Sequence, residues 1–114
     1  MKVTQLSPPP TQKIEFSFIG SKSVSAKMGT YAICNFHDEV MYVGLAIDLN
    51  RRIKEHLDSK EKTSVSEKGK AYWFYYLVLE HERDINRTER GWLNQSELED
   101  GDLPIFNKIR SPVG

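Results

Sequence analysis

The sequence predicts an α/β (α+β) fold: a small antiparallel sheet flanked by helices, with elements in the order β-β-α-β-α. Two apolar segments, residues 30–35 and 39–44, flank a polar turn and are typical of the arms of a β-hairpin. A third segment, residues 71–80, is apolar on both alternating faces, as in a strand that is covered on both sides. The segments 48–57 and 84–98 carry apolar residues at helical spacing, so we expect a helix before and after the third strand.

Length and composition limit the class of protein. The 114 residues support one domain, and a content of 39% hydrophobic and 28% charged residues excludes wholesale disorder. No apolar run approaches the ~20 residues that span a bilayer, and MKVTQLSPPP lacks the apolar middle section of a secretory signal. Cys34 is the only cysteine and cannot form an internal disulfide. We therefore expect a cytoplasmic protein that does not contact a membrane.

The N-terminal residues are expected to form an arm. Pro8-Pro9-Pro10 predicts an extended polyproline segment, and Ile14–Phe18 alternates apolar and polar residues. The alternation predicts a short strand or an extended segment packed on the body. We expect residues 1–27 to be a partly mobile arm and residues 28–114 to be the main domain.

Each arm of the hairpin carries a tyrosine close to a glycine, in Gly29-Thr30-Tyr31 and in Tyr42-Val43-Gly44. We expect Tyr31 to pair with Tyr42 across a four-residue turn. That register places both phenols on one face of the sheet, beside Ile33 and Val40. The neighbouring glycines would leave room for a bulky ligand to reach the strand backbone. Half-buried tyrosines are also common in strands, so either phenol alone fits a purely structural role.

The first helix begins at a predicted N-cap, Asp48, and runs to about Leu57. Its apolar stripe consists of Leu49, Ile53 and Leu57. Arg52 and His56, four residues apart, lie together at the border of that stripe, whereas Arg51 lies on the opposite side. Arg52 and His56 should point toward the body at the rim of its core. The alternative is an arginine stem packed on apolar surface with its head in water.

The second helix places a carboxylate on its inward face. That face contains Ile85, Trp92 and Leu93, and Glu89 falls in the middle of it. Because burying an unpaired carboxylate costs several kcal/mol, a cation should meet it. Two alternatives stay open: an internal ion pair with an arginine such as Arg52, or a ligand for a hard divalent cation. Gly91 in mid-helix indicates close approach of another backbone.

Charge is unevenly distributed although the formal net charge is zero. Bases outnumber acids between Arg51 and Lys70, whereas the charges from Glu97 to Asp102 are all acidic. The basic region could bind a polyanion such as nucleic acid. The alternative is that its charges only form an ordinary solvent-exposed surface. The nucleic-acid-binding residues that we expect there are Arg51, Lys54, Lys60 and Lys62. The stretch 59–70 predicts a mobile loop, and residues 103–107 predict an extended tail.

Two hydroxyls, an arginine, a histidine and a carboxylate could surround one small anion, and a phosphate suits them best. The order of motifs resembles the GIY-YIG endonuclease family over roughly residues 28–108. The matching segments are Gly29-Thr30-Tyr31, Tyr42-Val43-Gly44, DLNRRIKEHL, TERGWL and the Asn107 of PIFNK. The resemblance implies a central three-stranded antiparallel sheet. Homing endonucleases, some restriction enzymes and a subunit of bacterial nucleotide excision repair are members of this family.

The resemblance also implies roles for individual residues. The implied catalytic residues are Tyr31, Tyr42, Arg52, His56, Glu89 and Asn107. Glu89 would bind the single metal ion, Tyr31 would position or deprotonate the attacking water with His56 as proton acceptor, and Arg52 would neutralise the phosphate. Tyr42 and Asn107 would orient these groups. The departures from the family pattern are Thr30 in the first motif, Val43 in the second and Leu45 directly after it.

The implied function is that of an endonuclease that hydrolyses phosphodiester bonds in DNA with one Mg²⁺ or Mn²⁺ ion. RNA is an alternative substrate. We expect the 59–70 loop, the N-terminal arm, a homodimer or a partner protein to supply specificity. Two other classes stay open: a catalytically inactive GIY-YIG-like nucleic-acid-binding or interaction module, and a globular interaction protein whose polar cluster is an internal ion-pair network.

Overall fold

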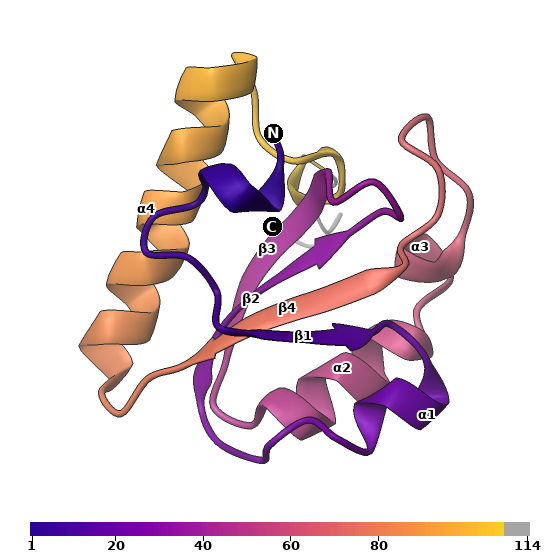
Figure 1. Ribbon diagram of the computed structural model, residues 1–114, viewed down its shortest axis with the longest axis vertical. Coiled ribbons are helices and arrows are strands. Elements are labelled where there is room, and N and C mark those ends of the chain that lie inside the picture. The colour runs from indigo at the N-terminus through magenta and orange to yellow at the C-terminus, as the bar shows by residue number, and fades with distance from the viewer. Residues whose placement is uncertain (109–114) are drawn as a thin grey trace, which may run out of the picture.

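The computed structural model describes residues 1–108, which form an antiparallel sheet with helices on both of its faces (Figure 1). The strands are β1 (Gln12–Glu15), β2 (Gly29–Cys34), β3 (Val40–Ala46) and β4 (Trp73–Val78), in the spatial order β1-β4-β2-β3. The helices are α1 (Phe18–Ser21), α2 (Leu49–Leu57), α3 (Lys60–Thr63) and α4 (Glu82–Asp100), and single 3₁₀ turns cover Val3–Gln5 and Ile105–Asn107. The predicted class, an antiparallel sheet flanked by helices, is confirmed.

The sheet has four strands, so the expected three-stranded sheet is wrong. The additional strand is β1, which pairs antiparallel with β4 from Gln12↔Tyr76 to Glu15↔Trp73. The period-2 alternation at residues 14–18 carried this signal, but it also fitted an extended arm. Pairing with β1 places β4 inside the sheet, with hydrogen-bonded neighbours on both edges.

Both faces of the sheet are buried, as the two-sided apolar pattern of residues 71–80 predicts. Phe74 and Tyr76 of β4 pack with Leu49 and Ile53 of α2 in one core. The side chains that alternate with them, Trp73 and Tyr75, pack around the buried Trp92 of α4 in a second core. Helices α2 and α4 therefore lie on opposite faces, as Figure 1 shows. Every residue of β2 is buried because this strand runs through the middle of both cores.

The hairpin register differs from the expected one. Tyr31 lies opposite Gly44 and Tyr42 lies opposite Ile33, so the expected Tyr31–Tyr42 pair is wrong. The two phenols still share a face, because the shift of two residues preserves the alternation of side chains. An irregularity between Ile33 and Cys34 makes Val40 the partner of Cys34 and moves Val40 into the opposite core.

Several segments outside the sheet are more ordered than expected. The predicted loop 59–70 contains α3, which Ser59 caps by accepting a hydrogen bond from the amide of Lys62. The predicted extended tail 103–107 ends in the 3₁₀ turn Ile105–Asn107. Helix α4 extends beyond both ends of the predicted 84–98 and stops at Gly101, whose φ of 76° is left-handed.

The N-terminal segment packs against α4. Val3 and Leu6 are buried in the second core, and the indole nitrogen of Trp92 donates a hydrogen bond of 2.9 Å to the carbonyl oxygen of Pro8. The expected domain boundary after residue 27 stays a prediction. Within residues 1–108, no helix is both long enough and apolar enough to cross a bilayer.

Candidate active site

The center of the candidate site is an aromatic cluster from three elements: Tyr31 on β2, Tyr42 on β3 and His56 on α2. The Tyr31 hydroxyl lies 2.6 Å from Nε2 of His56 in a buried hydrogen bond. The ring of Tyr42 is 6.1 Å from that of Tyr31 and 5.2 Å from that of His56, measured between centroids. Helix α2 positions His56 because the Asp48 side chain caps it, accepting from the amide of Arg51.

The two motif glycines are required by the protein's own packing. A Cβ atom at Gly44 would lie 2.5 Å from the Tyr31 hydroxyl and 2.9 Å from the Tyr42 ring. At Gly29 it would lie 2.2 Å from the carbonyl oxygen of Leu77 on the neighbouring strand. The expectation that these glycines leave room for a ligand is therefore wrong. Gly44 provides the space for the Tyr31 hydroxyl to reach His56.

Burial keeps the central hydrogen-bonded pair neutral. Desolvation, reinforced by the nearby Tyr42, raises the pKa of Tyr31 well above its ordinary value. Desolvation, together with the positive charges of Lys62 and Arg52, lowers the pKa of His56 to about 4. At neutral pH the Tyr31 hydroxyl can therefore donate its proton to an uncharged imidazole Nε2 when the imidazole proton lies on Nδ1.

The lowered pKa of His56 predicts a loss of stability in acid. The unfolded chain takes up a proton near the ordinary histidine pKa of about 6.5, whereas the folded protein takes it up only near about 4. Between these values the free energy of unfolding should fall by about 3 kcal/mol as the pH is lowered. Urea unfolding of the wild type and of His56→Gln from pH 7.5 to 4 measures this. The difference between the two proteins should shrink as the pH falls, and a constant difference would contradict the buried neutral state.

Glu89 reaches the site from α4. The Thr30 hydroxyl donates a buried hydrogen bond of 3.0 Å to the carbonyl oxygen of Ile85, one helical turn before Glu89, and thereby fixes this part of α4 on the sheet. Thr30, a departure from the family pattern, thus positions the helix. Desolvation raises the pKa of Glu89, with an opposing effect from Arg90. The charge of Glu89 in turn contributes to raising the pKa of both phenols, Tyr31 and Tyr42.

The ion pair between Glu89 and Arg52, one of the two alternatives for this carboxylate, does not form. Arg52 is half-exposed and its Nε lies 3.1 Å from Oε1 of Glu55 on its own helix. No cation lies within ion-pair distance of Glu89 among residues 1–108. Arg52 is nevertheless close enough to lower the pKa of Tyr42 and of His56 through its charge. Arginine and carboxylate therefore both lie near the phenols without neutralising each other.

The structure brings Lys62 into this cluster. Its side chain is buried, and its Nζ lies 4.6 Å from the center of the Tyr42 ring and 2.8 Å from Oε1 of Glu61. The sequence placed Lys62 only among the surface bases. Ser59, a favourable N-cap residue, could have predicted α3, but a helix of four residues has no measurable period from which to predict a buried face.

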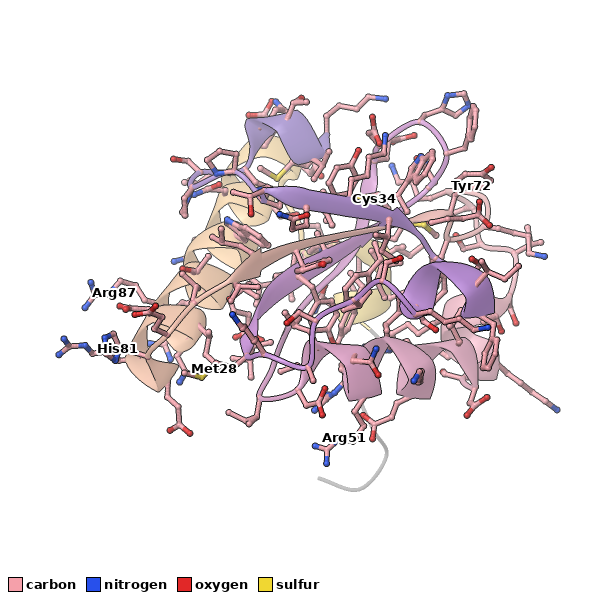
Figure 2. All side chains as sticks on the ribbon, turned by 60° about the horizontal axis from the view of Figure 1, so that its bottom comes forward. Met28, Cys34, Arg51, Tyr72, His81 and Arg87 are labelled. Atoms are coloured by element: carbon pink, nitrogen blue, oxygen red, sulfur yellow. The ribbon has the colours of Figure 1, made fainter. Side chains whose placement is uncertain are left out.

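The remaining predicted residues lie around the site. The amide of Asn107 is bound to the backbone of β3: Oδ1 accepts from the Val43 amide at 2.8 Å and Nδ2 donates to the Val43 carbonyl at 2.9 Å. Asn107 thus holds the C-terminal segment on the strand that carries Tyr42. Arg51, Lys54 and Lys60 are exposed, and Figure 2 shows Arg51 pointing away from the sheet below α2.

The fold is that of an α+β domain similar to the N-terminal endonuclease domain of UvrC. Two point mutants of that domain from Thermotoga maritima, each bound to its catalytic divalent cation, match with a TM-score of 0.56. Their sequence identities are 20% and 18%, and the match covers 79% of this chain and 91% of each of those chains. These identities establish the fold alone.

The family model described as the GIY-YIG catalytic domain matches residues 27–100. The chain belongs to the GIY-YIG family, as the motifs indicated. The UvrABC system protein C of Finegoldia magna is 33% identical over 63 residues, which are 54% of this chain. The match spans only 10% of that relative's length.

Proposed function

We propose that the protein is an endonuclease that uses one divalent cation, Mg²⁺ or Mn²⁺, to hydrolyse phosphodiester bonds in DNA. The observation that carries this proposal is the convergence of the buried Tyr31–His56 hydrogen bond with the charges of Glu89 and Arg52. The likeness to the UvrC endonuclease domain and membership of the GIY-YIG family support the same class of reaction.

Glu89 fits the role of metal ligand. Its carboxylate is partly desolvated and has no ion-pair partner among the described residues. Mg²⁺ is commonly held by one or two carboxylates together with water and substrate phosphate, so a single protein ligand is sufficient. When bound, such an ion supplies Lewis-acid stabilisation of the phosphate and of the departing 3′-oxygen.

The Tyr31–His56 pair handles the proton of the attacking water. In the proposed step the Tyr31 oxygen takes a proton from water while its own proton passes to Nε2 of His56, 2.6 Å away. The water oxygen then forms the new bond to phosphorus, and the 3′-oxygen departs. A Tyr31 anion is unfavourable in this buried position, because burial raises the pKa of Tyr31. The concerted transfer avoids that anion.

Arg52 and Lys62 stabilise the charge on the phosphate from two sides. Arg52 approaches from α2 and Lys62 from α3, and Tyr42 lies next to both. A guanidinium and an ammonium that are held in place act on the transition state without further reorganisation. The exposed bases Arg51, Lys54 and Lys60 then hold the flanking DNA. Tyr42 and Asn107 keep the second strand of the hairpin in position.

The test is the conversion of supercoiled plasmid to nicked circles by the purified protein. We expect nicking with Mg²⁺ or Mn²⁺ and none with chelator. Because one active site cuts one strand, nicked circles should precede linear DNA. Binding of the plasmid without nicking in Mg²⁺ would identify a catalytically inactive module. A protein that neither binds nor nicks would contradict the proposal altogether.

Lys62→Met is expected to lower the maximal nicking rate by about 10- to 100-fold, because one of two phosphate-facing cations is lost. The same change should raise the pKa of His56, since Lys62 is a cause of its lowering. Plasmid nicking at saturating protein and NMR titration of the histidine ring measure both effects. The matched variant Lys60→Met should change the concentration needed for half-maximal nicking but leave the His56 titration unaltered. Equal effects of the two lysines would contradict a position for Lys62 in the site.

A further inference from the structure

The N-terminal half of α4 carries a row of basic side chains that take no part in the candidate active site. Arg83, Arg87 and Arg90 are exposed and follow one another at spacings of four and three residues, which place them on one side of the helix. Together with Gly91 they line a shallow open hollow. We call these four residues the arginine row. In Figure 2 Arg87 extends outward from α4, away from the sheet.

The arginine row is not neutralised within the described part of the chain. None of its three guanidinium groups lies within 4.0 Å of a carboxylate in residues 1–108. The other end of α4 is acidic, with Glu97, Glu99 and Asp100 exposed. A polyanion is therefore attracted to the first half of the helix and repelled by the second, which limits where it can lie.

Gly91 adds an observation that concerns shape. A glycine in a helix interior is destabilising relative to alanine, and close packing is the usual reason for it. Among residues 1–108, no atom outside the helix turns around Gly91 lies within 4 Å of a Cβ built there, so the close approach of another backbone expected from the sequence is wrong. The open position directly follows Arg90, at the C-terminal end of the arginine row. The space at Gly91 is therefore open to the backbone of another molecule.

The arginine row borders the candidate active site. Arg90 directly follows Glu89 on α4. One helix thus carries both the half-buried Glu89, the proposed metal ligand, and the exposed arginine row. A nucleic-acid strand that leaves the site beside Glu89 can continue along the first half of α4.

We propose that the arginine row is a second nucleic-acid contact, which holds the sugar–phosphate backbone of DNA flanking the cleaved bond. It is separate from the basic side chains of α2 and α3. This inference rests on the proposed function and adds the path of the substrate. Arginine side chains pair with phosphate oxygens in a bidentate manner. The contact carries no base specificity, and its strength should depend on salt.

The test compares the double variant Arg83→Gln/Arg87→Gln with the wild type in chelator, where cleavage does not interfere. Binding of a fluorescent duplex is measured by anisotropy at several salt concentrations. Loss of two phosphate contacts should weaken binding by about tenfold and reduce the slope of log K against log salt by about 2. The control Lys22→Gln/Lys27→Gln removes two lysines outside the proposed contacts and should keep the wild-type slope.

Gly91 gives a test that does not depend on charge. Gly91→Ala should raise the melting temperature by a few degrees, roughly 3 °C, because the new methyl group meets no atom of the protein. Gly91→Leu should be as stable as the wild type or more stable and yet bind duplex several-fold more weakly. Wild-type affinity of the leucine variant would contradict a backbone at this position.

The outcomes separate this inference from the proposed function. A wild type that nicks plasmid while the double variant keeps its affinity and salt slope overturns the second contact alone. A wild type that neither binds nor nicks overturns both. If the double variant loses binding to polyglutamate but keeps duplex binding, the arginine row receives an acidic protein segment, and the nucleic-acid contact is wrong.

Discussion

Replacing Glu89 by glutamine is expected to reduce the rate of plasmid nicking by about a thousandfold or more. The variant keeps the size of the side chain but removes the carboxylate whose charge acts on the pKa of both phenols. Loss of a metal that stabilises the transition state by several kcal/mol accounts for an effect of this size. The measurement is the initial rate of nicking at saturating Mg²⁺.

Glu89→Gln should also separate catalysis from folding. Desolvation raises the pKa of Glu89 in the folded protein, so at neutral pH its ionised form is less favourable there than in the unfolded chain. A neutral glutamine removes this penalty, and the melting temperature without metal should stay equal or rise. Added Mn²⁺ should raise the melting temperature of the wild type but not of the variant. A variant that unfolds, or that nicks at the wild-type rate, would falsify the assignment of Glu89 as metal ligand.

Arg52→Ala is expected to lower the maximal nicking rate by about 100- to 1,000-fold, in the range observed when one group that stabilises transition-state charge is removed. The fold should persist, because Arg52 is half-exposed and, within residues 1–108, pairs only with Glu55 on the same helix. Circular dichroism and the rate at saturating substrate measure the two expectations. If Arg52 were important only for the structure, Arg52→Ala would change the circular dichroism spectrum and the nicking rate together.

The neighbouring residue provides the matched comparison for Arg52. Arg51 has the same charge and lies on the same turn of α2, but it is exposed and points away from the sheet. Arg51→Ala should raise the DNA concentration that gives half-maximal rate and leave the rate at saturation near the wild-type value. Equal reductions of the nicking rate at saturation by both alanine variants would contradict the claim that Arg52 and Arg51 have different roles because they lie on different faces of α2.

The face of a residue could be predicted from the sequence because faces depend only on local periodicity. Asp48 marked the start of α2, and the helical period separated Arg52 and His56 from Arg51. The same argument placed Glu89 on the inner side of α4 before any neighbour was known. The expected hairpin register also placed Tyr31 and Tyr42 on one face, and this part of the prediction survives because the observed register differs by two residues.

Pairing and close approach could not be predicted in this way, because both depend on residues far apart in the chain. The irregularity between Ile33 and Cys34 moved Val40 to the other core, and no local pattern announces it. The requirement for glycine at position 44 comes from the folded structure, in which the Tyr31 hydroxyl occupies the space that a side chain would need. Lys62 entered the site through α3, which is too short to show a period.

The contacts along the outer edge of β3 have a consequence for solubility. This edge strand would otherwise offer free amide and carbonyl groups to the sheet of another molecule. The chain blocks it at two points: the Met1 carbonyl accepts from the Val40 amide at 2.8 Å, and the Asn107 amide binds both backbone groups of Val43. A variant such as Asn107→Leu therefore opens a docking edge for intermolecular sheet extension, and its first visible defect should be aggregation on concentration.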